Sequence, residues 1–182
     1  MIKPGEQTET PMIRYIGNEA HYSDIIAGSL SVTKQLWIGT ADIKDLYISR
    51  NGTTVPYLKA LSDLIRRKIE VRLIHAKEPG PNFRKDFDKN PELWNGLERV
   101  LCPRVHFKVM VFDMKTVYVG SANLTGAGLG MKGKDSRNFE SGIFTNDRTI
   151  VQSVIQQFDD VWIGIHCRTC RRKAFCGDRI GG

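Results

Sequence analysis

Long hydrophobic runs are missing from this sequence. No apolar stretch approaches the ~20 residues that a transmembrane helix needs. The first 11 residues are mostly polar and lack the apolar segment of a secretory signal. The sequence also shows no internal repeat and no sign of a second domain. We therefore expect a single soluble domain in the cytoplasm that is not attached to a membrane.

An excess of acidic residues is also absent, since 27 Lys and Arg stand against 20 Asp and Glu and give a net charge of +7. The chain can still bury a core, because 41% of its residues are hydrophobic, and this excludes disorder over its whole length. A basic balance indicates an anionic partner, either nucleic acid or an anionic membrane surface, although many basic proteins bind nothing acidic.

Apolar periodicity predicts helices that alternate with strands along the chain. Helical spacing covers residues 19–34, 54–68 and 148–162. Short apolar or alternating runs predict strands at residues 36–38, 71–75, 105–113, 116–119 and 139–144. We expect a loop with at most one short helix at 78–92. This order predicts a single-domain α/β sandwich, a mixed β-sheet flanked by helices. The expected divisions are a flexible segment 1–11, a folded domain 12–163 and a tail 164–182 packed on it.

One strand carries an unusual polar pair. Side chains alternate along residues 105–113, so His106 and Lys108 share one face while the valines fill the other. A hairpin after Asp113 would return the next strand beside the first and bring Ser121 and Asn123 near the pair. An imidazole, an ammonium, a hydroxyl and an amide would then meet at one spot. This set suits phosphoryl transfer without a catalytic metal, because an imidazole can attack phosphorus while the protein's own donors hold its oxygens.

The same residues form a known pattern. His106-x-Lys108-x4-Asp113 followed by Gly120-Ser121-x-Asn123 resembles the signature of the phospholipase D superfamily, and the layout resembles it over residues 12–163. The resemblance implies that His106 forms a phosphohistidine, that Lys108 and Asn123 bind the phosphate with Ser121 beside them, and that Asp113 supports the architecture.

Members of that superfamily also use an acidic residue after the motif to hydrogen-bond the nucleophilic histidine, and Glu140 is the candidate here. They need two motifs for each active site, whereas this chain has one complete copy. His75-Ala76-Lys77 lacks the following Asp and the Gly-Ser-x-Asn, so we interpret it as a decoy. The single copy implies a homodimer with the two His106 side chains facing each other. Single-motif members are typically small nucleases.

The four cysteines indicate a second site. Cys167-x2-Cys170-x5-Cys176 lies in the tail and Cys102 just before the catalytic strand. Since disulfides are disfavoured in a reducing cytosol, we expect a metal site, first a structural [4Fe–4S] cluster and alternatively zinc, with His166 able to replace one thiolate in the zinc site. Free thiols without a metal are the remaining alternative. The spacing resembles the cluster ligands of iron–sulfur RecB-type nucleases.

The resulting hypothesis is a metal-independent, dimeric endonuclease that hydrolyses phosphodiester bonds of single-stranded DNA or RNA. The alternatives are a phospholipase or phosphatidyltransferase of the same superfamily, and a nucleic-acid-binding module without catalysis. The candidate nucleic-acid contacts lie in a glycine-rich loop and in the basic tail: Lys132, Lys134, Arg168, Arg171, Arg172 and Lys173.

Overall fold

A computed structural model of the protein describes residues 10–178, apart from the side chain of Lys134. Most of the expected flexible segment 1–11 and the last four residues of the tail therefore lie outside the described residues. Within them, seven strands form one mixed sheet in the order β1-β9-β8-β7-β2-β5-β6. The strands are β1 (Ile13–Gly17), β2 (Gln35–Thr40), β5 (Glu70–His75), β6 (Leu97–Leu101), β7 (Val109–Phe112), β8 (Thr116–Gly120) and β9 (Ser141–Thr145).

The sheet is parallel on one side and antiparallel on the other. β2, β5 and β6 run parallel, while β7, β8, β9 and β1 pair antiparallel. The helices are η1 (His21–Ile26), α1 (Ala27–Ser29), α2 (Tyr57–Arg66), α3 (Pro81–Asp88), α4 (Glu92–Gly96), η2 (Lys134–Ser136), α5 (Arg148–Trp162) and η3 (Lys173–Phe175). A separate hairpin, β3 (Tyr47–Arg50) with β4 (Thr53–Pro56), turns at Asn51-Gly52. The predicted α/β class is confirmed.

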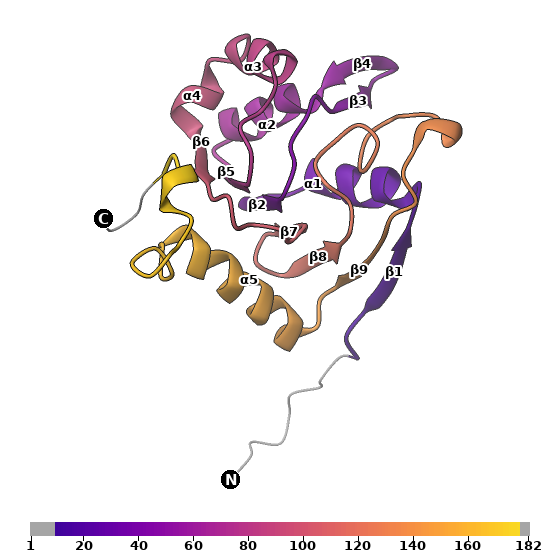
Figure 1. Ribbon diagram of the computed structural model, residues 1–182. Coiled ribbons are helices and arrows are strands. Elements are labelled where there is room, and N and C mark those ends of the chain that lie inside the picture. The colour runs from indigo at the N-terminus through magenta and orange to yellow at the C-terminus, as the bar shows by residue number, and fades with distance from the viewer. Residues whose placement is uncertain (1–9, 179–182) are drawn as a thin grey trace.

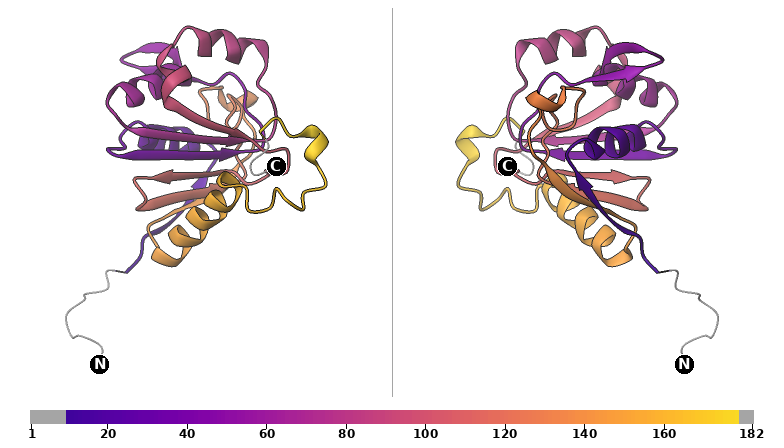
Figure 2. Two further views of the ribbon diagram at one scale, coloured as in Figure 1. Left: turned by 90° about the vertical axis from the view of Figure 1, so that its left-hand side faces the viewer. Right: turned by 90° about the vertical axis from the view of Figure 1, so that its right-hand side faces the viewer.

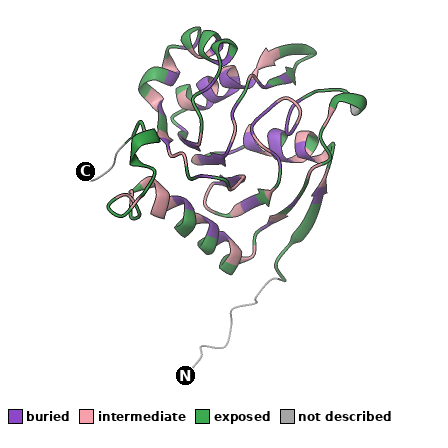
Figure 3. Ribbon diagram, viewed as in Figure 1, coloured by how far each residue is buried: buried purple, intermediate pink, exposed green. Residues whose placement is uncertain are grey.

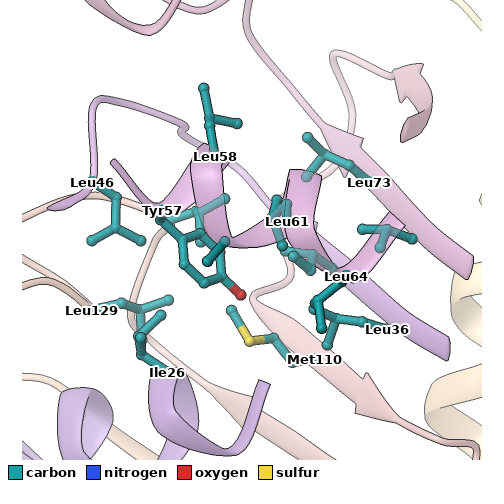
Figure 4. Close-up of a cluster of buried hydrophobic side chains, with 14 of the residues drawn as sticks. Ile26, Leu36, Leu46, Tyr57, Leu58, Leu61, Leu64, Leu73, Met110 and Leu129 are labelled. Atoms are coloured by element: carbon teal, nitrogen blue, oxygen red, sulfur yellow. The ribbon is translucent and has the colours of Figure 1, made fainter. Parts of the chain in front are cut away.

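Each face of the sheet has its own hydrophobic core (Figures 1 and 2). The larger one packs the first helices and α2 against the sheet, and Figure 4 shows Tyr57, Leu61 and Leu64 of α2 above Leu36 and Met110. The other core lies under α5. The residues that α5 covers or contributes include Trp37, Ile74, Val109, Val111, Val117, Val151, Val154 and Phe158. The two clusters explain why the central strands β2 and β7 are almost wholly buried (Figure 3).

The strongest patterns predicted their elements well. α5 matches the expected helix 148–162, and the Asp147 side chain caps it by accepting a hydrogen bond of 2.9 Å from the Ile150 N–H. Two expectations were wrong in extent, since the helix at 19–34 ends at Ser29 and the helix at 54–68 begins only at Tyr57. Residues 78–92 contain one short helix, α3, as expected, and α4 begins at their last residue.

Two strands of the sheet escaped the sequence reasoning. β1 is an edge strand with Ile13 and Tyr15 exposed, so it lacks the apolar alternation of a half-buried strand. β6 carries the exposed residues Glu98 and Arg99 in its middle, so it also lacks the apolar alternation that predicts a strand. The expected strand 105–113 is shorter in the structure, where β7 covers only Val109–Phe112. Its pairing with β2 stops at Val109, which lies opposite Gly39.

Candidate active site

The predicted polar residues gather at one edge of the sheet. The chain enters β7 through residues 106–108 and leaves β8 through residues 121–123, and these two strands are antiparallel. A hydrogen bond of 3.0 Å from the Gly120 N–H to the Lys108 carbonyl joins the two segments. β2 and β5 also end at this edge, because Gly39 pairs with both Val109 and Ile74.

His106 and Lys108 contact each other directly. The Lys108 Nζ atom lies 3.3 Å from His106 Nδ1 and donates a hydrogen bond of 2.8 Å to the His106 carbonyl oxygen. His106 is exposed, whereas Val105 and Val109 on the opposite face are buried, as the alternation predicted. An ammonium has three donors. One donor of Lys108 therefore stays available for an anion beside the imidazole.

Asn123 is held by its carbonyl oxygen. Its Oδ1 atom accepts hydrogen bonds from the Asp42 N–H at 3.1 Å and from the Thr40 hydroxyl at 3.4 Å. These bonds orient the amide and leave Nδ2 without a partner within residues 10–178. Because Nδ2 can only donate, the arrangement presents a fixed donor to an anion.

Thr40 is the residue behind this arrangement that the sequence reasoning missed. It is buried at the end of β2, and its Oγ1 atom also accepts from the Leu124 N–H at 3.0 Å. The only local signal is its position after a buried strand. Its role depends on the pairing of β2 with β7, which the sequence does not display.

Glu140 lies beside Ser121. The Ser121 hydroxyl donates a hydrogen bond to one Glu140 oxygen, and the Asn138 amide donates to the other at 3.0 Å. The Ser141 N–H donates to the Ser121 hydroxyl at 3.0 Å. The expected hydrogen bond from His106 to Glu140 is not formed among the described residues, and the two carboxylate oxygens instead accept from Ser121 and Asn138. Glu140 thus orients Ser121 in this single copy.

Asp113 lies at the opposite end of β7, away from the site. Its carboxylate accepts hydrogen bonds from the backbone N–H groups of Thr33, Lys34 and Gln35 at 2.7–3.1 Å, and from the Thr33 hydroxyl at 2.9 Å. Burial alone would raise the pKa of Asp113, but these hydrogen bonds outweigh it and lower the pKa to about 2. The carboxylate therefore ties the start of β2 to the β7–β8 hairpin.

Two glycine positions next to the site are closely packed. A Cβ on Gly120 would lie 2.1 Å from the Tyr118 hydroxyl and 2.7 Å from the Ser141 carbonyl, so no larger residue fits there. The glycine-rich segment after Asn123 is also partly buried. Gly128, Leu129 and Gly130 are buried, and a Cβ on Gly128 would lie 2.6 Å from the Asn123 carbonyl. This segment packs against Asn123 and supports it.

The candidate nucleic-acid contacts divide into two groups. Lys132 is exposed on the far half of the glycine-rich segment, while the side chain of Lys134 lies outside the description. The tail cations Arg168, Arg171, Arg172 and Lys173 are all exposed.

The tail returns to the end of β6, because the Leu101 N–H donates a hydrogen bond of 2.6 Å to Asp178. β6 ends at the same sheet edge as β2 and the segment that carries His106 and Lys108, since Leu101 pairs with His75 and His75 pairs with Thr40.

The four cysteines line one cavity of about 1110 Å³ between residues 102–107, α5 and the tail. Burial raises the pKa of the Cys176 thiol, and the nearby thiols of Cys102 and Cys167 add to the effect. The Arg172 N–H donates to the Cys170 sulfur at 3.4 Å and lowers the pKa of that thiol. In residues 10–178 no three His, Cys, Asp or Glu side chains converge closely enough to hold a metal ion in this conformation.

His75 remains a structural residue. It is fully buried, its Nδ1 atom lies 2.7 Å from the Lys77 carbonyl, and its Nε2 atom has no partner among residues 10–178. Burial lowers its pKa, which favours the neutral ring. Since the ring cannot reach solvent, this geometry agrees with its interpretation as a decoy.

Residues 30–162 match the family model described as "Cardiolipin synthase, PLD-like domain". The chain belongs to this phospholipase D-like family. No curated protein has a significantly similar sequence. Within the described residues, no helix is long and apolar enough to cross a membrane.

Solved structures resemble this phospholipase D-like chain in fold. Nuc from Salmonella typhimurium, a phospholipase D family member, superposes with a TM-score of 0.58 at 17% identity, covering 84% of this chain and 95% of Nuc. NucT from Helicobacter pylori gives a TM-score of 0.57 at 17% identity, with 83% and 95% covered. The archaeal chromatin protein TrmBL2 gives 0.56 at 14% identity, with 86% and 55% covered. At these identities the similarity establishes the fold.

Proposed function

We propose that the protein is a metal-independent phosphodiesterase that hydrolyses nucleic acid through a phosphohistidine, at a site completed by a second copy of the chain. The observation that carries the proposal is the grouping of His106, the Lys108 ammonium and the pre-oriented Asn123 amide at one open sheet edge. The family of the chain and the fold of Nuc and NucT support a phosphodiester substrate.

The reaction begins with Nε2 of His106, which Lys108 does not contact. Attack by Nε2 forms an N–P bond and breaks the P–O bond to the leaving nucleoside. It requires the ring proton on Nδ1, so the contact between Lys108 and Nδ1 must loosen when the phosphate attracts the ammonium. Lys108 and the Nδ2 group of Asn123 then stabilise the negative charge on the phosphoryl oxygens.

His106 of the partner subunit supplies the remaining proton transfers. As an imidazolium it protonates the leaving oxygen, and as a neutral base it then takes a proton from the water that hydrolyses the phosphohistidine.

A row of exposed apolar side chains next to the site supports a second copy of the chain as the partner that covers this surface. Tyr15, Ile143 and Val119 pair in register across β1, β9 and β8 and are 71%, 44% and 38% exposed. Val119 lies two residues before Ser121.

The test is a substrate panel with excess EDTA: single-stranded DNA, duplex DNA, RNA and a short-chain phosphatidylcholine. We expect cleavage of a single-stranded nucleic acid that EDTA does not reduce. Turnover of the lipid alone would contradict the nuclease proposal and favour the lipid branch of the family. Loss of all cleavage in EDTA would contradict metal independence.

Phe139 supports a single-stranded substrate. Its side chain is 97% exposed and directly precedes Glu140. An exposed aromatic ring beside the site can stack on a base, and such stacking contributes about 1–3 kcal/mol. We expect Phe139→Ala to weaken single-stranded DNA binding about 5- to 150-fold, measured by fluorescence anisotropy in a His106→Ala background.

Trp94→Ala is the matched control, because Trp94 is 66% exposed on α4, which leads into the start of β6, whereas the candidate site lies at the edge where β6 ends. Sedimentation should show the same dimer for both variants. Unchanged affinity in Phe139→Ala, or a loss that accompanies dissociation of the dimer, would argue against a stacking role.

A further inference from the structure

A cavity of about 1110 Å³, lined in part by residues 102–105 and Phe107, lies next to the segment that carries His106 and is not used by the proposed reaction. We propose that Cys102, Cys167, Cys170 and Cys176 bind a [4Fe–4S] cluster in this cavity. The cluster would join the basic tail to the segment that carries His106. This inference does not rest on the proposed nuclease activity.

The fold brings the cysteines together from two distant parts of the sequence. Cys102 follows β6 and is held by a hydrogen bond of 2.9 Å from its N–H to the His75 carbonyl. The other three lie in the tail, which passes α5 and returns to β6 (Figure 1). All four side chains line the same cavity and are partly accessible, and none forms a disulfide. The sequence spacing could not show that the four thiols line one cavity, and the structure shows it.

The tail has the local structure of a thiolate-binding turn. Cys170 N–H bonds to the Cys167 carbonyl at 3.2 Å, which closes a turn over the C-x2-C spacing. The Arg172 N–H points at the Cys170 sulfur at 3.4 Å. Backbone donors to sulfur stabilise thiolates and tune metal sites.

Positive charges surround the sulfurs. Arg104 and Lys173 line the cavity with the cysteines. A cluster held by four thiolates is an anion, and each thiol releases its proton when it binds iron. The cations would offset that charge. No Asp or Glu lines the cavity except Asp160, so the lining favours an anionic centre.

The size of the shared cavity favours a cluster over a single zinc ion. A zinc ion draws four ligands within ~2.3 Å of one point. The described side chains do not converge in this way. A four-iron cluster spreads its ligands, because each thiolate binds a different iron. The cavity of about 1110 Å³ also offers room for a larger centre than one ion.

The experiment uses the full chain purified without oxygen, with iron, zinc and acid-labile sulfide measured per chain and spectra recorded before and after dithionite. We expect about four iron and four sulfide per chain and a visible absorption band that dithionite bleaches. One zinc per chain, or no metal in a folded protein, would overturn the proposal.

Two variants keep the test independent of folding. Cys170→Ser alters a partly exposed tail residue outside both hydrophobic cores, and we expect it to lose at least one iron per chain while circular dichroism stays unchanged. His166→Ala changes another cavity-lining residue that is not a proposed ligand, and it should keep full iron content. Equal iron content in wild type and Cys170→Ser would contradict the four-thiolate assignment. Loss of the metal in His166→Ala would do the same.

Discussion

His106→Ala is expected to lower the rate of nucleic-acid cleavage about 10⁴-fold or more, because it removes the atom that forms the N–P bond in the proposed reaction. The stability should hardly change, since the His106 side chain is exposed and packs in neither hydrophobic core. The comparison is made in EDTA on the substrate that the wild type prefers. His166→Ala, the loss of another exposed histidine, serves as the matched control and should keep its activity.

A trapping experiment separates a nucleophile from a binding residue. A substrate with radioactive phosphorus at the cleaved bond, quenched in base during turnover, should label the wild type and not His106→Ala. Label retained in the variant would show that another residue attacks. A variant that keeps more than a few per cent of the wild-type rate would contradict the nucleophile assignment directly.

The same variant tests whether the site is shared. When equal amounts of wild type and His106→Ala are co-expressed, only roughly a quarter of random dimers contain two intact histidines. A shared site that needs both therefore predicts roughly a quarter of the activity expected for pure wild type. Activity near one half would mean that each copy works alone, and it would contradict the shared site without contradicting the nuclease.

Asp113→Ala is expected to give the largest loss of stability among single changes to the motif. The carboxylate accepts hydrogen bonds from three consecutive backbone N–H groups and one hydroxyl. Hydrogen bonds to a charged group contribute about 1.5–3 kcal/mol each but are not additive, so we expect a loss of about 3 kcal/mol. For a chain of this size that lowers the Tm by about 6–12 °C.

The pH dependence identifies the cause of that loss. The pKa of Asp113 is about 2 in the folded protein and lies near 3.9 in an unfolded chain. Its stabilisation is thus fully present above about pH 5 and disappears as the pH falls toward 2. The shift corresponds to about 2 kcal/mol at most, since the side chain is partly exposed.

We therefore expect the gap between wild type and Asp113→Ala in urea unfolding to narrow as the pH is lowered from 6 to 3. Asp88→Ala, which changes an exposed acid on α3 without a side-chain hydrogen bond or ion pair among residues 10–178, should show no gap at either pH. A gap that is constant with pH would point to packing as the cause.

The candidate site was predictable to the extent that it depends on short spacings. Alternation places His106 and Lys108 on one face, and a hairpin returns Ser121 and Asn123 to the same edge, because a tight turn leaves no other pairing partner so close. The hydrogen-bond partner of Glu140 could not be predicted in this way. Its partner, Ser121, is 19 positions away and was not the residue expected.

The sequence by itself determined the α/β class, the helix α5, the β7–β8 hairpin and the residue types of the site, since all of these follow from local periodicity and adjacent chemistry. The tertiary structure alone decided which donors face the site. Thr40 orients Asn123 because β2 pairs with β7, and the tail cysteines line the same cavity as Cys102, in a tail that Asp178 ties to the end of β6. Such contacts join residues that are 75 or more positions apart, and no local pattern records them.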